Sequence, residues 1–270
     1  MDSKSHEQHT AYPTNNSFFR SAAEFSQQHR KERLSTGSKH LDDLLSGGLE
    51  LGEITQFYGA PTAGKTHLCH FLCVVLPSQY QVIYIDTEGT FREEKIQSIA
   101  KARKLDPVNI LQNVKILQPK DSKQQESCIE DACSNVKSNS KIKLLIIDSM
   151  MFHYRAEYPG RSGLSKRAER LNIYMHKLRN LAQTYNIAVV MTNQSTSTSH
   201  ATSEFKDPRP FGGKVISYTC TYIIQLVHRS ANTSSVDARL VKSPLKGFGW
   251  HPLMIVERGF EDRDPYFVNG

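Results

Sequence analysis

Short apolar runs alternate with amphipathic segments through the middle of the chain. Runs such as VIYID and KLLIID are apolar almost throughout, and the segments between them repeat apolar residues at helical spacing. This pattern predicts strands at 54–58, 82–86, near 113–118, 143–148 and 187–192. It predicts helices at 65–77, 92–103, 122–137 and 164–185. Apolar strands joined by helices are typical of a parallel sheet covered on both faces, so we predict an α/β fold.

The pattern changes after residue 215. Strand-like segments now follow one another with short connections, as TYIIQLVHR, DARLVKS and HPLMIVERG. Short connections join antiparallel strands, whereas parallel strands need a long crossover. We therefore expect a C-terminal antiparallel β extension at one edge of the mostly parallel sheet.

The chain also divides into regions by polarity. Residues 1–18 are polar and aperiodic, which predicts a disordered tail. Residues 19–34 predict a linker that is poor in apolar residues, and the compact core is expected over 35–270. Within that core, the Ser- and Thr-rich run 195–203 predicts a mobile loop rather than a linker between domains.

Composition narrows the class of protein. The 270 residues carry a formal net charge of +7 with a pI near 9.1, which favours a polyanionic partner. No apolar run matches a membrane helix and the first residues lack a signal-peptide core, so we expect a soluble, intracellular protein with no membrane partner. Five scattered cysteines favour reduced thiols. His67, Cys69, His70 and Cys73 would need distant ligands to bind zinc, so we favour packing in the core.

One segment has the pattern of a phosphate-binding loop between a strand and a helix. It fits G-x-x-x-x-G-K-[ST] at Gly59, Ala60, Pro61, Thr62, Ala63, Gly64, Lys65 and Thr66. Glycines allow backbone N–H groups to approach a phosphate without collision. Lys65 and the positive end of the following helix favour the same anion, and the Thr66 hydroxyl can ligate Mg²⁺. We predict a nucleotide site with Mg²⁺; a glycine-rich turn with a chance Gly-Lys-Thr is the alternative.

Three polar residues follow the ends of other predicted strands. Asp148 ends an apolar strand, where it can complete the Mg²⁺ shell. Glu88 follows the strand 82–86 and can activate the water that attacks a γ-phosphate; the alternative is a carboxylate at a helix N-terminus, which suits Glu93 and Glu94 better than Glu88. Gln194 follows the strand 187–192, where its amide can contact the γ-phosphate and lead into the mobile loop.

Two loops combine cationic and aromatic residues in a way that suits single-stranded nucleic acid. The first, about 154–164, contains Arg155, Tyr158 and Arg161, and Arg167 continues the charge onto the next helix. The second, about 195–211, contains Phe205, Lys206 and Arg209. An ordinary solvated, charged loop is the alternative in both cases.

Together these segments resemble the RadA branch of the RecA-like recombinases, which comprises archaeal RadA and its eukaryotic strand-exchange relatives. The resemblance runs from about Phe19 onward, in the family's order, through LSTGSKHLDDLLSGGLELGEIT, the phosphate loop, YIDTEGTFREEKI, LLIIDS, YRAEYPGRSGLSKR, MTNQ, DPRPFGG and KSP. It implies a RecA-like P-loop ATPase core that uses ATP and Mg²⁺. It also implies a filament on single-stranded DNA that pairs with a homologous duplex and exchanges strands.

The resemblance also implies roles for single residues. Lys65 and Thr66 would bind phosphate and Mg²⁺, Asp148 would support the metal, Glu88 would activate water and Gln194 would sense the γ-phosphate. We count His67, which follows the loop, among the nucleotide contacts. The DNA-binding residues would be Arg155, Tyr158, Arg161, Arg167, Phe205, Lys206 and Arg209. Phe19 and Ala22 resemble the F-x-x-A polymerisation motif, whose side chains would occupy a pocket on the neighbouring copy.

The sequence departs from the family's pattern at several positions. Lys95 stands where an Arg commonly stacks on adenine, which would weaken planar stacking. Tyr218 replaces a His that is thought to couple nucleotide to DNA. Lys242, next to Pro244 in the cap over the neighbour's ATP, replaces an Asp, and we expect its ammonium to substitute for a monovalent cation. The family usually carries a helical DNA-binding domain before the F-x-x-A motif; we expect this protein to lack it, so that duplex capture would depend on the core or on another protein.

Two other functions compete with a self-sufficient recombinase. A RadB-like accessory paralogue would bind DNA or a recombinase and aid loading without exchanging strands. A RecA-like signalling ATPase would share the phosphate loop but would not bind DNA. The expected partners are single- and double-stranded DNA, further copies in a filament or ring, and another recombinase or mediator. The expected location is the cytoplasm or nucleoid in an archaeon, or the nucleus in a eukaryote.

Overall fold

The computed structural model describes residue 22 and residues 31–196, 208–229 and 234–263. The chain divides into two units, residues 1–32 and 33–270. Only Ala22 and residues 31 and 32 are described in the first unit, so the predicted tail of residues 1–18 lies outside the described residues. The fold reported below is that of the second unit.

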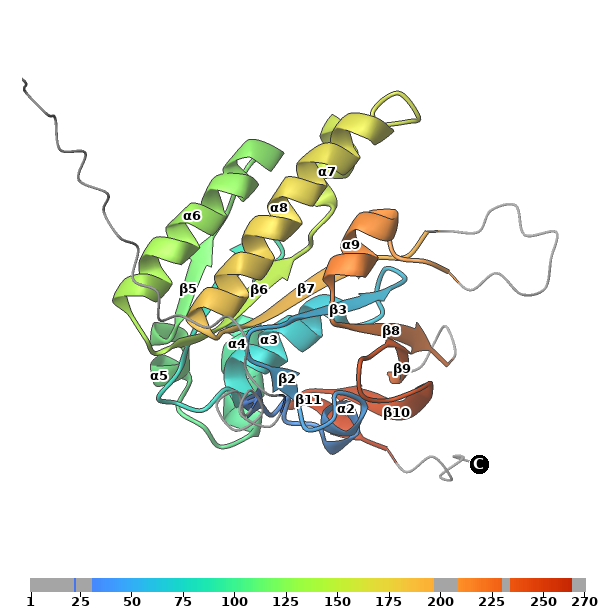
Figure 1. Cartoon of the computed structure of the whole chain (residues 1–270). Coiled ribbons are helices and arrows are strands. Elements are labelled where there is room, and N and C mark those ends of the chain that lie inside the picture. Colours follow the sequence, from blue (N-terminus) through green and yellow to red (C-terminus); the bar gives the residue numbers. More distant parts are fainter. Residues whose placement is uncertain (1–21, 23–30, 197–207, 230–233, 264–270) are drawn as a thin grey trace, which may run out of the picture. The chain divides into compact units, whose positions relative to one another are not determined.

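A mixed nine-stranded sheet forms the centre of this unit, in the order β11-β10-β9-β8-β3-β7-β6-β4-β5 (Figure 1). The parallel strands are β3 (Ile54–Gly59), β4 (Gln81–Asp86), β5 (Val114–Leu117), β6 (Ile142–Asp148), β7 (Ala188–Gln194) and β8 (Tyr222–His228). The antiparallel strands are β9 (Ser235–Lys242), β10 (Gly249–Val256) and β11 (Gly259–Asp262). The predicted α/β class and the antiparallel extension at one edge are confirmed, but the segment TYIIQLVHR is placed differently: as β8 it pairs parallel to β3, and the antiparallel pairing begins between β8 and β9.

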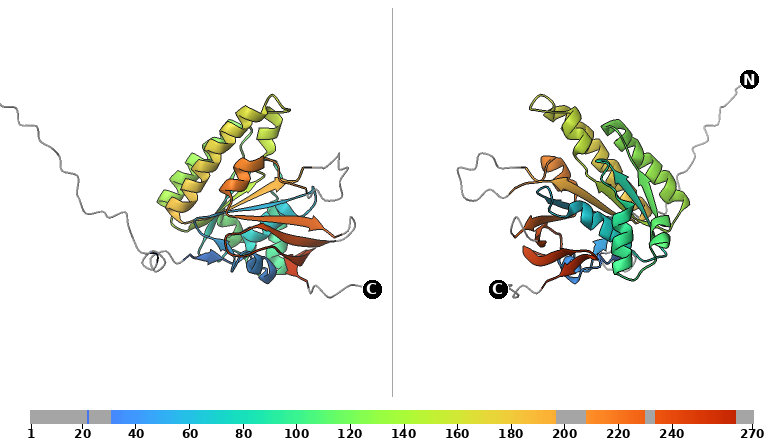
Figure 2. Two further views of the ribbon diagram at one scale, coloured as in Figure 1. Left: turned by 45° about the vertical axis from the view of Figure 1, so that its right-hand side comes forward. Right: turned by 180° about the vertical axis from the view of Figure 1, so that it is seen from behind.

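Helices cover both faces of the sheet. One face carries α3 (Lys65–Val75) and α4 (Glu93–Ala102), and the other carries α6 (Ser122–Ser138) and α8 (Leu164–Tyr185). Figure 2 shows α6 and α8 side by side from two further directions. The sequence pattern did not predict the shorter elements, which are β1 (Arg33–Leu34), α2 (Lys39–Leu44), β2 (Leu49–Glu50), α5 (Pro107–Gln112), α7 (Phe152–Glu157) and α9 (Gly213–Thr219).

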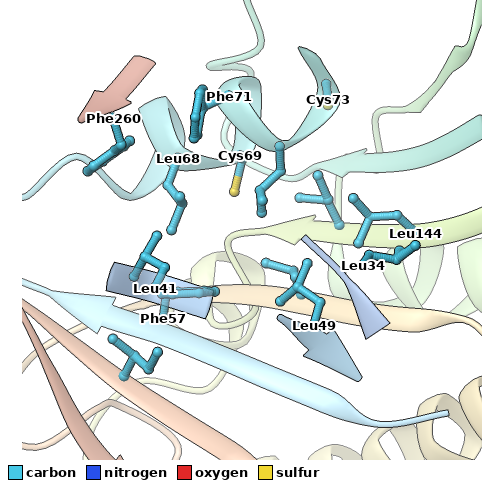
Figure 3. Close-up of a cluster of buried hydrophobic side chains, with 14 of the residues drawn as sticks. Leu34, Leu41, Leu49, Phe57, Leu68, Cys69, Phe71, Cys73, Leu144 and Phe260 are labelled. Carbon is cyan, nitrogen blue, oxygen red and sulfur yellow. The ribbon is translucent and has the colours of Figure 1, made fainter. Parts of the chain in front are cut away.

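The core consists of two hydrophobic clusters, one on each face of the sheet. Neighbouring residues of β6 point into different clusters, because successive side chains of a strand alternate between its two faces. Leu144 and Ile146 join α3 and α4, whereas Leu145 and Ile147 join α6 and α8. In Figure 3, Leu68 of α3 points toward the strands of the first cluster. This alternation explains why the central strands are apolar throughout.

The thiols of α3 belong to that core. Cys69 and Cys73 are buried, and burial raises the pKa of both thiols. No group of three or more His, Cys, Asp or Glu residues suited to a metal ion occurs among the described residues. The burial of Cys69 and Cys73 agrees with the interpretation of these residues as core packing. Within the same described part, none of the helices has the length and apolar composition that a membrane span requires.

His70 of α3 is a buried base with a depressed pKa. Burial lowers the pKa of its imidazole from 6.5 to about 4, while its Nε2 accepts a hydrogen bond of 3.2 Å from the backbone N–H of Arg92. Between those two pH values the unfolded chain binds a proton on this ring and the folded chain does not. The stability due to neutral His70 is therefore complete above pH 6.5 and is lost as the pH falls toward 4.

The first helix of the unit is capped from the other end of the sequence. The Asp262 carboxylate, at the end of β11, accepts hydrogen bonds from the backbone N–H groups of Lys39 at 2.8 Å and His40 at 3.2 Å, and from the Ser38 hydroxyl. Ser38 in turn caps α2 by accepting from the Leu41 N–H at 3.2 Å. These bonds satisfy N–H groups that a helix start otherwise leaves without partners.

Candidate nucleotide and DNA site

The register of the parallel strands brings the predicted site residues to one edge of the sheet. Gly59 at the end of β3 pairs with Gln194 at the end of β7, and Asp86 at the end of β4 pairs with Asp148 at the end of β6. Because these strands run in the same direction, their carboxyl ends meet at the same edge. Glu88 follows β4 by two residues and therefore lies at this edge as well.

The phosphate loop connects β3 to α3 at this edge. Thr62 and Gly64 both have left-handed backbone angles, with φ of 69° and 83°. Lys65 opens the helix, and its ammonium donates to the carbonyl oxygens of Gly59 at 3.1 Å and Ala60 at 2.7 Å. No side chain caps the start of α3, so its first N–H groups are available to an anion. This uncapped helix start fits the phosphates of a nucleotide.

The loop glycines are required by the protein itself. A Cβ at Gly59 would lie 2.3 Å from the carbonyl oxygen of Leu226 in β8. A Cβ at Gly64 would lie 2.5 Å from Cδ1 of Ile255 in β10, in addition to the strain of a left-handed residue. We attributed both glycines to the approach of a phosphate, but contact with the β8 backbone already requires Gly59, and at position 64 the left-handed backbone favours glycine.

Asp148 is a buried carboxylate held by two hydroxyl groups. Tyr84 donates to Oδ2 at 2.9 Å, and Thr192 donates to Oδ1. Burial lowers the pKa of the Lys65 ammonium, and the nearby Asp148 and Glu88 carboxylates oppose that shift. Carboxylate and hydroxyl oxygens are the ligands that Mg²⁺ prefers, so Asp148 and Thr66 fit the metal that accompanies a nucleotide.

Glu88 is held in place by the residue that follows Asp148. The Ser149 hydroxyl donates to Oε1 of Glu88, and the Asp148–Ser149 peptide is cis. Thr87 accepts from the Ser149 N–H and donates to the Ser149 carbonyl, both at 2.8 Å, which joins the ends of β4 and β6. The carboxylate of Glu88 is therefore held next to the end of β6, near Asp148, which we predicted to support Mg²⁺.

The other residues predicted to contact nucleotide lie around this centre. His67 donates from Nε2 to the Gly259 carbonyl at 3.1 Å and packs beside Phe260, so its ring joins α3 to β11. Burial lowers the pKa of His67, and the charge of Lys95, in the first turn of α4, lowers it further. Pro244 is exposed between β9 and β10.

The Lys242 ammonium caps α9 within the chain. It donates to the carbonyl oxygens of Ser217 at 2.8 Å, Tyr218 at 3.3 Å and Cys220 at 2.6 Å. A cation is favourable at this end of a helix because the last carbonyls carry partial negative charge. The contact that we expected between Lys242 and the phosphate of a neighbouring copy stays a prediction. In this structure the ammonium binds the carbonyl oxygens at the end of α9. Tyr218 is 70% exposed and available to a partner.

The first predicted DNA loop is partly helical and partly tied to the core. Helix α7 occupies its first residues, and Tyr154 is fully buried, with its hydroxyl donating to Glu126 of α6 at 2.8 Å. Arg170 binds the same carboxylate through Nε at 3.0 Å and Nη2 at 2.8 Å. Arg167 donates to the carbonyl oxygen of Tyr158 at 3.0 Å. Residues 154–157 of the predicted loop 154–164 therefore belong to a helix, and Tyr154 lies in the core.

The residues predicted to bind DNA in the first loop differ in their exposure and in their hydrogen bonds. Arg167 and Tyr158 have the partners just described, so their role toward DNA stays a prediction. Arg155 and Arg161 are exposed. Arg155 donates from Nη1 to Oε1 of Gln194 at 2.7 Å, and its guanidinium lies 4.0 Å from the ring centroid of Phe211. The first loop thus contacts both the predicted γ-phosphate sensor and the end of the second loop.

The second loop is closed at its base by backbone hydrogen bonds. Ser195 forms a bridge with Pro210, and the Thr196 N–H donates to the Arg209 carbonyl at 2.7 Å. Arg209 is exposed at this base. Phe205 and Lys206 lie outside the described residues, as does Phe19 of the polymerisation motif. Their DNA and subunit contacts stay predictions.

Several residues that support the site were not singled out from the sequence. Tyr84 and Thr192 hold Asp148, and Ser149 holds Glu88. Polar residues inside or directly after apolar strands were a usable signal for all three. His228, whose Nε2 donates to the Thr62 carbonyl of the phosphate loop at 2.9 Å, gave no such signal because it lies 166 positions away.

Comparison with known families agrees with this geometry. A model of the Rad51 family matches residues 27–263, which covers the phosphate loop, the carboxylates and both predicted DNA loops. Members of this family are RecA-like, ATP-binding proteins of DNA recombination that generally bind DNA and oligomerise. The match covers well over half of the sequence, and the chain therefore belongs to the Rad51 family.

Proposed function

We propose that this protein is an ATP-dependent DNA recombinase that forms a filament on single-stranded DNA and exchanges strands with a homologous duplex. The observation that carries the proposal is that residues suited to a nucleotide and a residue suited to DNA lie at the same edge of the sheet. The uncapped start of α3 lies there beside the Glu88 and Asp148 carboxylates, and Arg155 contacts Gln194 at the same edge. A signalling ATPase would need the residues suited to a nucleotide but not the arginine suited to DNA.

The nucleotide chemistry follows from the positions of the side chains. Lys65 would leave the carbonyls of Gly59 and Ala60 to neutralise the β- and γ-phosphates. Thr66 and Asp148 would hold Mg²⁺, which supplies charge neutralisation when bound. Glu88, fixed by Ser149, would orient the attacking water and take its proton. Gln194 would contact the γ-phosphate from the end of β7.

The remaining proposed contacts are with DNA, with adenine and with neighbouring copies. Arg155, Arg161 and Arg209 would neutralise DNA phosphates, which gives affinity that falls with salt. Lys206 and Phe205 would add charge and base stacking from the middle of the second loop. Phe19 and Ala22 would join one copy to the next. Lys95 would face the adenine, and Lys242 and Pro244 would approach the ATP of a neighbouring copy.

The experiment is strand exchange between circular single-stranded DNA and a homologous linear duplex, with ATP and Mg²⁺. We expect exchange by the wild type, none with a heterologous duplex and none by Lys65→Ala. Lys101→Ala, exposed near the end of α4, is a matched control for the loss of a lysine and should exchange strands normally. Absence of both ATP turnover and DNA binding in the wild type would refute the proposal.

An accessory, RadB-like role is the second candidate. It is favoured by the internal pairing of the first loop, where Arg167 and Arg170 already bind Tyr158 and Glu126 and leave fewer cations for DNA. Salt-dependent DNA binding and ATP turnover without exchange would identify this role. ATP turnover without DNA binding would instead identify the signalling ATPase.

A further inference from the structure

The hydrogen bond between Arg155 and Gln194 joins the two halves of the site. Nη1 of Arg155, in α7, lies 2.7 Å from Oε1 of Gln194, at the end of β7. Gln194 pairs in the sheet with Gly59, the first residue of the phosphate loop. A residue predicted to bind DNA therefore touches a residue predicted to touch the nucleotide.

The chemistry of the two groups determines which end of the amide is engaged. A guanidinium carries only donors, so it can bond to the amide of Gln194 only through the oxygen Oε1. The Nε2 donors of that amide are then the end left for another partner, and the oxygens of a γ-phosphate only accept. If the amide were turned the other way, its N–H donors would face the donors of the guanidinium and its oxygen would face the phosphate oxygens. Neither pair could form a hydrogen bond. From this geometry we infer that Arg155 is a positioning residue that orients Gln194 to donate to the γ-phosphate.

Phe211 holds the guanidinium in that position. Its ring centroid lies 4.0 Å from Cζ of Arg155, close enough for a stacked cation–π contact. The ring is itself anchored to β7, because the Phe211 N–H donates to the Gln194 carbonyl at 3.1 Å and its carbonyl accepts from Asn193 Nδ2 at 2.6 Å. Arg155, Gln194 and Phe211 thus form one connected unit at the base of the second loop.

This unit predicts the sign of the coupling between nucleotide and DNA. Arg155 is exposed, and a guanidinium has five N–H donors, so it can bind a DNA phosphate while it keeps its bond to Gln194. A phosphate bound there would order the guanidinium, and the ordered guanidinium would order the amide. Because such coupling is reciprocal, each ligand should strengthen the binding of the other. The inference rests on the proposed contact of Gln194 with the γ-phosphate.

The test measures nucleotide affinity in the absence of DNA. The affinities of a non-hydrolysable ATP analogue and of ADP are compared in the wild type, Arg155→Ala, Arg155→Lys, Gln194→Ala and the double variant. Arg155→Ala should weaken analogue binding about fivefold to tenfold, the usual effect of one lost hydrogen bond, and should leave ADP binding unchanged. Arg155→Lys should restore part of the loss, since an ammonium can donate to Oε1 but lacks the planar fork. In the Gln194→Ala background, Arg155→Ala should have no further effect.

Arg179→Ala is the matched control, because Arg179 is exposed on α8 and has no hydrogen bond or ion pair within the described residues. If Arg155→Ala binds the analogue as tightly as Arg179→Ala does, the inference is wrong and the proposed function is untouched. The same conclusion follows if Arg155→Ala still weakens binding fully in the Gln194→Ala background. A wild type that does not bind the analogue would overturn the proposed function and the inference together.

Discussion

Replacing Tyr84 with phenylalanine removes one hydroxyl from the centre of the site and leaves the packing almost unchanged. That hydroxyl donates to Oδ2 of Asp148 at 2.9 Å. Burial raises the pKa of the Tyr84 hydroxyl well above its ordinary value, so it remains a donor at neutral pH. The variant therefore isolates one hydrogen bond to the carboxylate that we expect to support Mg²⁺.

The magnitude follows from the burial of both partners. Tyr84 is 0% exposed and Asp148 is 3% exposed, so water cannot replace the lost donor. A hydrogen bond to a charged group contributes about 1.5–3 kcal/mol to folding, which for a domain of this size lowers Tm by about 3–12 °C. Residues that orient a metal ligand typically change metal affinity by about 10- to 100-fold. We expect both effects in Tyr84→Phe, with the Thr192 hydrogen bond still in place.

The assays are a thermal melt and a titration of ATP turnover with Mg²⁺. Tyr185→Phe is the control, because Tyr185 is partly buried at the end of α8 and its hydroxyl makes no hydrogen bond within the described part of the chain. Tyr84→Phe should melt earlier and need more Mg²⁺ than this control. If the two variants match in both measurements, the argument that Tyr84 supports Asp148 is wrong.

Three further predictions concern other parts of the site and its support. His70→Gln keeps an acceptor but cannot be protonated, so between pH 7 and pH 5 the wild type should lose about 2 kcal/mol more unfolding free energy in urea melts than this variant does; equal losses would exclude His70 as the cause. Ser149→Ala frees Glu88 and should lower the kcat of ATP turnover several-fold with little change in KM, and an unchanged kcat would show that Glu88 needs no such support. Gly59→Ala should abolish ATP binding and destabilise the fold, because its Cβ would lie 2.3 Å from a carbonyl oxygen of β8, whereas Gly247→Ala has open space and should resemble the wild type; a stable, ATP-binding Gly59→Ala would contradict the packing argument.

The parts of the fold with strong local patterns could be predicted from the sequence. The apolar runs identified the parallel strands other than β8, and the phosphate loop was recognisable because Gly59, Gly64, Lys65 and Thr66 lie within eight consecutive residues. Helix α5 was missed although it had a usable start signal, since Asp106 caps it and Pro107 occupies its first turn. Its six residues are too few to show a helical period.

The rest of the site depends on pairs of residues that are distant in the sequence. Tyr154 falls in the predicted loop 154–164, but its hydroxyl reaches Glu126 and its ring completes the core. His228 reaches Thr62 only because β8 is placed beside β3. No local pattern reports such contacts, since the packing of helices and strands decides which side chains meet.

The cap on α2 has a consequence for the order in which the chain can fold during synthesis. Ser38 and the Asp262 carboxylate that it contacts are 224 positions apart. At roughly 5–20 residues per second, a ribosome needs about 11–45 s to make the intervening chain. Throughout that interval the start of α2 lacks a bonding partner that β11 provides in the finished fold. Until translation has passed β11, we therefore expect the start of α2 to stay exposed in the nascent chain and accessible to chaperones.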